Sequence, residues 1–430
     1  MASDEFQQLS IAVTANDAAA VANLLERDPS LKAKLNDPLP TESFGTVALQ
    51  VAVRRANRAM IDALLDAGAD INQRSHWWAG SFGVFDDADA ADWLPDYLIS
   101  RGARLEPTVA AKLNRLDDLK AMVAADPSAV HARGGDGQTA LHRAATVEMA
   151  AFLLDHGADI DARDVDHESR PAQYLVRGRP DVARYLVSRG CSTDILLGAA
   201  LGDTAVVARH LAANPPAVRT SVDATWFPMK NLHAGGTIYI WTLGGRKTAH
   251  TIAREFGHAE VEQLLWKASD DSLSLTMACE LGADDLVRSL ITARPDLVRA
   301  LQPADVTRIV AAAELRNGEA VKRMLAIGWP AGTVDRGGLT ALHWTGFHGD
   351  AATARALLAA GAPLDVRDDT HSGTPLGWAL WGSVHGWHRQ HGDYVGTVQA
   401  MLDAGATPPE VTDALVASDD VKRVLAQHRS

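Results

Sequence analysis

Cysteine is nearly absent from this chain of 430 residues, which contains only Cys191 and Cys279. Two cysteines are too few for a disulfide framework, and these two are too far apart to form a C-x-x-C pair. Such sparse cysteine is typical of proteins from a reducing compartment. We therefore expect a cytoplasmic protein without structural disulfides.

Basic residues and long apolar runs are also in short supply. The chain has 41 Lys and Arg against 54 Asp and Glu, and its formal net charge is −13. A negative protein repels the phosphate backbone of nucleic acids and has no general attraction to anionic lipid. No apolar run approaches the length of about eighteen residues expected of a membrane helix, and residues 1–6 lack the pattern of a secretion signal. We expect no nucleic-acid partner and no membrane partner.

A repeated unit is the main feature that the chain does contain. Residues 139–163 begin with Thr-Ala-Leu-His-Arg-Ala-Ala, continue with apolar residues at helical spacing, and close with Gly157-Ala-Asp. Glycine at such a position supplies the left-handed residue that ends a helix. A near copy opens with Thr340-Ala-Leu-His and closes at Gly361, which lies 33 residues after the glycine at 328. One unit has too little apolar surface to fold alone, so we expect neighbouring units to stack.

This unit resembles the ankyrin repeat, which is about 33 residues long and carries a T-P-L-H-x-A signature. The resemblance covers nearly the whole chain outside residues 220–246 and 383–393. It implies an all-α, bacterial-type ankyrin solenoid of about 11 to 13 helical-pair units, several of them degenerate. It also implies recognition of a partner, because ankyrin arrays usually bind proteins.

The repeat period fails between residues 220 and 246. Residues 237–243 read Thr-Ile-Tyr-Ile-Trp-Thr-Leu and lie between two glycine pairs. Because β-branched and aromatic residues favour strands, we predict a β-like insertion. In the ankyrin family the turns between units project along the concave groove, so the resemblance implies that this insertion leans over that groove. Long irregular segments of this kind are commonly lids or binding loops.

The repeats and the insertion together predict the domain organisation. We expect N-terminal repeats over residues 1–219, the insertion over 220–246, and C-terminal repeats over 247–430. Within the last part, the unit that contains residues 383–393 is about eleven residues longer than the ankyrin period, which predicts a second, short insertion there.

A charged turn tip is the first candidate site. Asp166, His167, Glu168 and Arg170 lie together, and Arg170 stands where the family signature has a threonine. A carboxylate, an imidazole and a guanidinium on one tip can bind an anion or move a proton, although a solvated turn has the same composition. On the functional interpretation, His167 and Glu168 are the catalytic acid-base residues.

Tryptophans give the second signal. Trp226 and Trp241 lie in the insertion, while Trp344 and Trp378 directly follow the signature histidine position, where the family has small or polar residues. Large rings on the groove side suit a ligand pocket or a peptide anchor, or they pack beneath the insertion as its own core. The predicted ligand-binding residues are Asp166, Arg170, Tyr174, Trp226, Lys230, Tyr239, Trp241, Trp344, His371, Trp378 and Trp381.

The remaining histidines favour structural roles. His142, His250 and His343 occupy the signature position, where the resemblance implies hydrogen bonds to neighbouring turns. Residues 385–391 contain three histidines spaced by three residues, a pattern that is conceivable for a metal site, but surface histidines are the favoured interpretation. We predict no metal site and no cofactor.

Two functions remain open from the sequence. The first is an ankyrin-repeat binding protein that recognises a partner or a compact ligand in its groove beneath the insertion. The alternative is a cofactor-independent enzyme for small molecules, such as a lyase, isomerase or hydrolase, in which His167 or Glu168 is the base and Arg170 or Lys230 binds an anion. A closed cavity of about a few hundred Å³ beneath the insertion favours chemistry, whereas an open apolar groove favours a peptide or protein.

Overall fold

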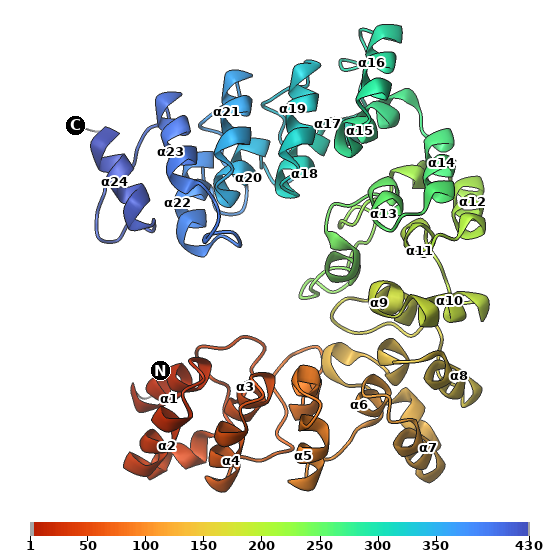
Figure 1. The fold of residues 1–430 in the computed structure, drawn as a ribbon, viewed down its shortest axis with the longest axis vertical. Coiled ribbons are helices and arrows are strands. Elements are labelled where there is room, and N and C mark those ends of the chain that lie inside the picture. Colours follow the sequence, from red (N-terminus) through yellow and green to blue (C-terminus); the bar gives the residue numbers. More distant parts are fainter. Residues whose placement is uncertain (1–3, 429–430) are drawn as a thin grey trace. The chain divides into compact units, whose positions relative to one another are not determined.

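The computed structural model describes residues 4–428 and is built from helices joined by turns (Figure 1). Its contacts divide it into two compact units. The first unit holds residues 4–207 and 220–247, and the second holds residues 208–219 and 248–428. The boundary between the units falls at residues 207–208, within α12 (Thr204–Ala213). None of the helices formed by residues 4–428 is long and apolar enough to cross a membrane.

The first unit is a series of paired helices in which α1 packs on α2, α3 on α4, α6 on α7 and α9 on α10 (Figure 1). The α-helices are α1 (Asp4–Thr14), α2 (Ala18–Arg27), α3 (Ala48–Arg54), α4 (Arg58–Asp66), α5 (Leu94–Ser100), α6 (Pro107–Lys112), α7 (Leu116–Ala125), α8 (Val147–Asp155), α9 (Pro171–Gly178), α10 (Pro180–Ser188) and α11 (Ile195–Leu201). Short 3₁₀ turns replace or follow helices at η1 (Pro29–Lys34), η2 (Val84–Ala90), η3 (Pro127–His131), η4 (Gly135–Gly137) and η5 (Ala140–Arg143).

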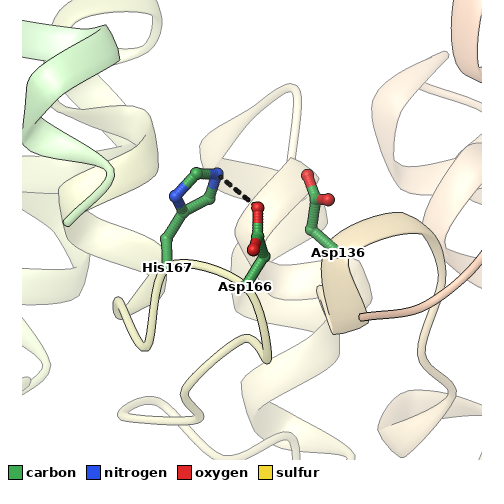
Figure 2. A group of neighbouring side chains, drawn as sticks. All are labelled: Asp136, Asp166 and His167. Atoms are coloured by element: carbon green, nitrogen blue, oxygen red, sulfur yellow. Dashed lines mark ion pairs between the residues drawn. The ribbon is translucent and has the colours of Figure 1, made fainter. Parts of the chain in front are cut away.

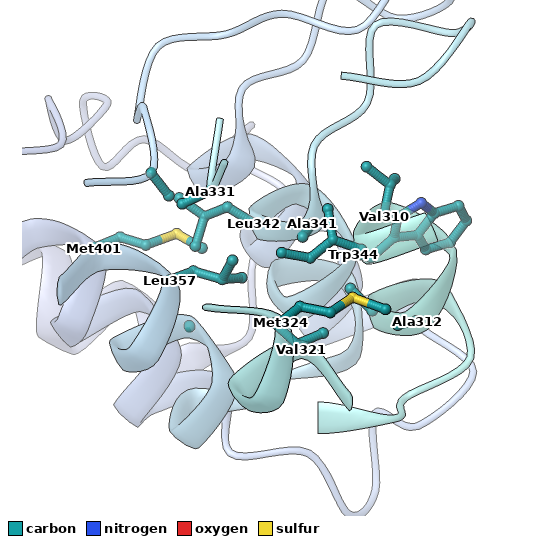
Figure 3. Packing of buried hydrophobic residues seen from close by; sticks show 14 of the residues in the cluster. Val310, Ala312, Val321, Met324, Ala331, Ala341, Leu342, Trp344, Leu357 and Met401 are labelled. Atoms are coloured by element: carbon teal, nitrogen blue, oxygen red, sulfur yellow. The ribbon is translucent and has the colours of Figure 1, made fainter. Parts of the chain in front are cut away.

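The second unit continues the same pairing, and one apolar cluster forms most of its core from Leu275 onward (part of it is shown in Figure 3). Its elements are η6 (Pro215–Arg219), α13 (Ala249–Glu255), α14 (Ala259–Ala268), α15 (Asp271–Leu281), α16 (Asp284–Ala293), α17 (Pro303–Val306), α18 (Arg308–Glu314), α19 (Gly318–Ala326), α20 (Ala341–His348), α21 (Ala351–Ala359), α22 (Pro375–His385), α23 (Tyr394–Asp403) and α24 (Asp419–His428). The predicted all-α class is confirmed over the described residues.

The closing glycines end helices as the sequence indicates. Gly157 has φ +91°, and a Cβ added to it would meet nothing within 4 Å. Its role is therefore conformational and does not depend on close packing. The Ala158 N–H then donates to the Leu153 carbonyl at 3.0 Å, which satisfies an acceptor left open at the end of α8.

His142 and His343 bind neighbouring turns, which confirms their structural interpretation. His250 differs, because its Nε2 lies 2.9 Å from the Ser269 hydroxyl oxygen and its Nδ1 meets no partner among the described residues. His142 Nδ1 accepts from the Thr139 N–H at 3.1 Å, and its Nε2 donates to the Ser169 carbonyl at 3.1 Å. Gln50 makes the corresponding pair of bonds, because its Oε1 accepts from the Val47 N–H and its Nε2 donates to a carbonyl of the next turn. The amide therefore has the same reach as the imidazole at this position.

This equivalence yields a prediction about acid stability. Burial lowers the pKa of His142 to about 4, whereas an unfolded histidine titrates near about 6.5. Between these two pKa values the unfolded chain binds more protons than the folded chain. The contribution of His142 to the free energy of unfolding is therefore fully present above about pH 6.5 and is lost as the pH falls toward 4, by at most about 1.4 kcal/mol per pH unit. We expect His142→Gln to remove this loss and to stay within about 1 kcal/mol of the parent at pH 7.

Urea denaturation of the two proteins at pH 7 and pH 4.5 measures the effect. His343→Gln provides a parallel case, since burial also lowers the pKa of His343. Equal acid sensitivity in parent and His142→Gln would show that protonation of this imidazole does not destabilise the fold.

The predicted strand in the insertion is wrong. Residues 4–428 contain no strand, only isolated bridges such as Arg133 with Thr139. Ile240–Gly244 instead forms a turn of π-helix, η7. The physical reason is that β-propensity reflects packing on a pleated surface beside another strand, and the insertion has no such neighbour. Winding the segment buries Ile238, Tyr239 and Leu243 on one body of repeats.

Candidate functional site

The insertion folds back onto the charged turn tip between α8 and α9. The Gly235 N–H donates to the Asp166 carbonyl at 3.0 Å, and the Ile238 N–H donates to Ser169 Oγ at 3.1 Å. His167 Nδ1 lies 2.8 Å from the Gly236 carbonyl oxygen. Two segments about 70 residues apart in the sequence are thus joined by backbone groups, so the geometry of the site is fixed by main chain as well as side chains.

Two acids shape this contact without facing the cavity. Asp164 accepts from the N–H groups of His167 and Ser169, both at 2.7 Å, and so holds the tip in its turn. Glu168 has φ +45° and accepts from the N–H groups of Lys230 and Asn231 at 2.8–3.1 Å. The Glu168 carboxylate therefore fastens the insertion to the tip.

A cavity of about 320 Å³ lies between the insertion and the repeats of the first unit. Most of its wall is aromatic or apolar, and its polar groups are few. The lining residues are Phe44, Trp77, Phe82, Asp136, Gln138, Asp166, His167, Tyr174, His233, Gly235, Ile238 and Trp241. This size and this mixture are typical of sites for small molecules.

Asp136, Asp166 and His167 form a cluster in the cavity wall (Figure 2). One polar atom from each residue lies within 4.8 Å of the other two. His167 Nε2 is 3.5 Å from Asp166 Oδ2, and both side chains are buried. Two carboxylates and an imidazole therefore share one small volume that opens toward the aromatic wall.

Asp136 is held in place from three directions. It lies in η4 with φ +56°, a left-handed conformation that aspartate tolerates better than most residues. Its N–H donates to the Gly80 carbonyl at 3.0 Å, and its carbonyl accepts from the Val165 N–H at 2.8 Å. Its carboxylate accepts from Trp77 Nε1 at 3.0 Å. The main chain and the indole together fix the direction of this side chain.

The electrostatics of the cluster favour a neutral or compensated Asp136. Burial raises the pKa of Asp136 to about 6, with His167 acting in the opposite direction and Asp166 adding to the rise. Like charges that share a buried site disfavour one another's ionised forms. Asp136 therefore gives up its proton much less readily than an exposed aspartate.

The proton on His167 is assigned by its partner. A carbonyl oxygen only accepts hydrogen bonds, so the 2.8 Å contact with Gly236 requires a hydrogen on Nδ1. Nε2 faces the Asp166 carboxylate at 3.5 Å, so the two groups form an ion pair when the ring carries a second proton, and Nε2 keeps a lone pair when the ring is neutral. The cluster thus presents an imidazole nitrogen beside carboxylate oxygens.

Tyr174 adds a hydroxyl to the same wall. Its ring lies edge-on to His142 and His167, with centroid separations of 5.1 and 6.2 Å. The hydroxyl is buried next to the Asp164 carboxylate. Burial, with the nearby Asp164 charge adding, raises the pKa of Tyr174 above its ordinary value, so the group stays a neutral donor.

The structure brings together four of the predicted site residues, namely Asp166, His167, Tyr174 and Trp241. Trp241 is 72% exposed at the edge of the cavity. The other predicted residues of the first unit lie outside the lining set: Glu168, Arg170, Trp226, Lys230 and Tyr239. Of these, Tyr239 is fully buried beneath the insertion and donates to the Asp194 carboxylate at 2.9 Å.

The remaining predicted residues belong to the second unit. Trp344 is only 8% exposed and lies in the apolar core shown in Figure 3. Its ring meets the Trp378 ring edge-on at 5.4 Å and stacks at 5.7 Å on His348. Trp381 is half exposed and lies 4.1 Å from the ring of His385. The first two rings therefore pack in the repeat core of the second unit, and not beneath the 220–246 insertion, which belongs to the first unit.

A turn tip in the second unit is built like that of the first. Asp368 accepts from the N–H groups of His371 and Gly373, at 2.7 and 2.8 Å, as Asp164 does in the first unit. His371 thus occupies the place of His167. Its side chain is exposed, because no inserted segment covers this tip in the way that 220–246 covers the other.

Sequence reasoning missed Asp136 and three aromatic residues of the wall, namely Phe44, Trp77 and Phe82. Asp136 lies three residues before the signature Thr139. In the next repeat Arg170 stands at the position of Thr139, and Asp166 lies four residues before it. Consecutive units therefore place these two acids at neighbouring tips. That register was a usable signal. No comparable signal links Phe44 to Trp241, because their meeting depends on the path of the insertion.

Comparison with known proteins adds the repeat family. A family model described as ankyrin repeats in three copies matches residues 108–196, and a single-repeat ankyrin model matches residues 337–369. No curated protein matches the chain. Among solved structures, a chain from the complex of a predatory endopeptidase of Bdellovibrio bacteriovorus with an immunity protein matches with 21% identity and a TM-score of 0.29, over 44% of this chain and 100% of that chain.

Proposed function

Since this chain is an ankyrin-repeat protein, we propose that it is a binding protein whose first unit holds one compact ligand in the cavity beneath the 220–246 insertion. Ankyrin repeats supply the rigid wall, and the insertion supplies the cover. Ligand sites are commonly built on loops that a rigid scaffold positions.

The observation that carries this proposal is the cavity of about 320 Å³ with mostly aromatic walls and a small polar cluster. A protein–protein interface would present a broad surface of about 800 Å² on each partner, which this cavity does not resemble. Aromatic walls bury the apolar body of a ligand, and the few polar groups orient it. Tyr174 adds one polar group to this mostly apolar wall.

An enzyme is the second candidate function, favoured by the Asp136, Asp166 and His167 cluster. An imidazole and a carboxylate with a raised pKa are the groups that general acid–base catalysis uses near neutral pH. His167 is the better base candidate, because the Glu168 carboxylate is already occupied by two N–H groups of the insertion. Conversion of a bound compound, followed by mass spectrometry, distinguishes an enzyme from a binding protein.

A thermal-shift screen of compact metabolites against the full chain tests the binding function. At a concentration of about 100 times Kd, a ligand stabilises the folded state by about 2.7 kcal/mol. We expect at least one compound to raise Tm, and we expect Trp241→Ala and Tyr174→Phe to remove the shift. Trp93→Ala is the matched control, since Trp93 is a partly exposed tryptophan of the same unit outside the cavity.

The outcomes separate clearly. A ligand shift that survives in both cavity variants places the site elsewhere. If no compound shifts Tm and a protein partner is recovered whose binding Trp241→Ala leaves intact, the cavity is not the binding site.

A further inference from the structure

Each member of the three-residue cluster is fixed by groups outside it, and the Gln138 amide also donates to Asp136 Oδ2 at 3.5 Å. Asp136 accepts from the Trp77 indole, Asp166 Oδ1 accepts from the Gly235 N–H at 3.1 Å, and His167 Nδ1 donates to the Gly236 carbonyl. The opposite atoms of Asp166 and His167, Oδ2 and Nε2, face each other at 3.5 Å, at the outer limit of a hydrogen bond. The outer contacts therefore aim the inner atoms at a common point.

The repeat fold does not need these acids. In the turn tip of the second unit, Gly337 and Thr370 stand at the positions of Asp136 and Asp166, and the backbone contact is kept, with the Asp369 N–H donating to the Gly337 carbonyl at 2.9 Å. The same scaffold thus forms without either carboxylate. Two acids placed side by side in a buried wall cost free energy unless a cation compensates them.

We propose that Asp136, Asp166 and His167 bind a divalent first-row transition metal ion whose remaining coordination positions face the cavity. This inference rests on the proposed function in one respect. The ion lies in the same cavity, and its remaining coordination positions are available to the compact ligand. The inference departs from the expectation, drawn from the sequence, of a chain without a metal site.

The donor set fits this ion class. One imidazole nitrogen and two carboxylate oxygens suit ions such as Mn²⁺, Fe²⁺ and Zn²⁺, whereas Mg²⁺ and Ca²⁺ prefer oxygen alone. Ligand atoms on opposite sides of such an ion are about 4.4 Å apart, and the inner atoms here lie within 4.8 Å of one another. Three protein ligands leave positions for water or a bound compound, as in open metal sites.

The surroundings of the cluster also fit. A metal-binding histidine ordinarily donates its second ring N–H to a backbone carbonyl or a carboxylate, and His167 donates to Gly236. The Trp77 and Gly235 N–H donors orient the two carboxylates in the same manner. The insertion therefore completes the site, because it supplies both groups that hold Asp166 and His167.

Titration with Mn²⁺ alone tests the proposal on the full chain after dialysis against EDTA. The electron paramagnetic resonance signal of free Mn²⁺ measures the bound fraction. We expect one Mn²⁺ per chain, and we expect Asp166→Asn and His167→Gln each to weaken binding by about 100-fold or more. Asp136→Asn is a third, conservative variant, and far-UV circular dichroism with Tm in EDTA verifies that each variant is folded.

Matched controls come from the second unit. Asp369→Asn removes an exposed carboxylate next to the equivalent tip, and His391→Ala removes an exposed histidine of the 385–391 run. Both are expected to keep the Mn²⁺ affinity of the parent within about twofold. Loss of binding in His391→Ala, or full binding in a folded Asp166→Asn, overturns the proposal.

The metal inference and the proposed function fail separately. Suppose that a metabolite raises Tm in EDTA, that this rise depends on Trp241, and that the protein binds no Mn²⁺. The metal proposal is then wrong, and the ligand site stands. If tetramethylammonium raises Tm and Mn²⁺ does not, the two carboxylates bind an organic cation, and the metal assignment is wrong. If the protein binds Mn²⁺ and no metabolite raises Tm, the metal proposal stands and the proposed binding of a compact ligand is wrong.

Discussion

Replacing Tyr239 with alanine is expected to lower the free energy of unfolding by about 4 kcal/mol. The ring is fully buried and meets Phe227 edge-on at 5.4 Å, and the hydroxyl donates to both oxygens of Asp194 at 2.9 and 3.1 Å. The truncation leaves a cavity beneath the insertion and removes a hydrogen bond to a charged acceptor. Urea denaturation, followed by tryptophan fluorescence, measures the loss.

Tyr239→Phe separates the two contributions, because it keeps the ring and removes only the hydroxyl. We expect it to cost about 1 to 3 kcal/mol, the range for a hydrogen bond to a charged group. In Tyr239→Ala we expect ligand affinity to fall together with stability, because the same segment carries Gly235 and Trp241 into the cavity. A loss below about 1 kcal/mol in Tyr239→Ala would mean that the insertion is held by the tip contacts and not by this ring.

Local signals predicted the helices well. The glycine at 157 ends α8, and the histidines at 142 and 343 bridge neighbouring turns, because each of these roles depends on residues within about one repeat. Helix ends and caps are short-range features, and the repeat period copies them along the chain. The same reasoning applied to Gln50, which lacks the imidazole, shows that the required feature is an acceptor and a donor at fixed reach.

The insertion could not be predicted in the same way. Residues 237–243 have the composition of a strand, but a strand requires a neighbouring edge, and the contacts available are the tip at 164–170 and the face of α9. The same holds for the site, because local sequence patterns do not predict its long-range contacts. Asp166 and His167 were predicted from local chemistry, whereas Phe44 and Trp77 join them only through long-range packing. Asp136 lies between these cases, since the repeat register places it at the tip before Asp166.

In the second unit, breaking the ion pair between Glu280 on α15 and Arg308 on α18 is expected to cost about 3 to 5 kcal/mol. Both residues are buried, and Arg308 Nε and Nη2 donate to the two carboxylate oxygens at 2.6 and 2.7 Å. Glu280→Ala removes the bidentate carboxylate from a buried guanidinium, so a main offset to the desolvation cost of the cation is lost. Denaturation in urea gives the change in the free energy of unfolding.

Two further variants show whether the charge or the packing is responsible. Glu319→Ala removes an exposed carboxylate paired with Lys322 at 2.8 Å on the next turn of α19, and an exposed pair of this kind contributes little to stability. The double variant Glu280→Met with Arg308→Met replaces the buried pair by apolar side chains of similar length. Because it removes both desolvation costs together, we expect it to be much more stable than Glu280→Ala. If the double variant is as unstable as the single one, packing by the two long side chains, and not the uncompensated charge, accounts for the loss.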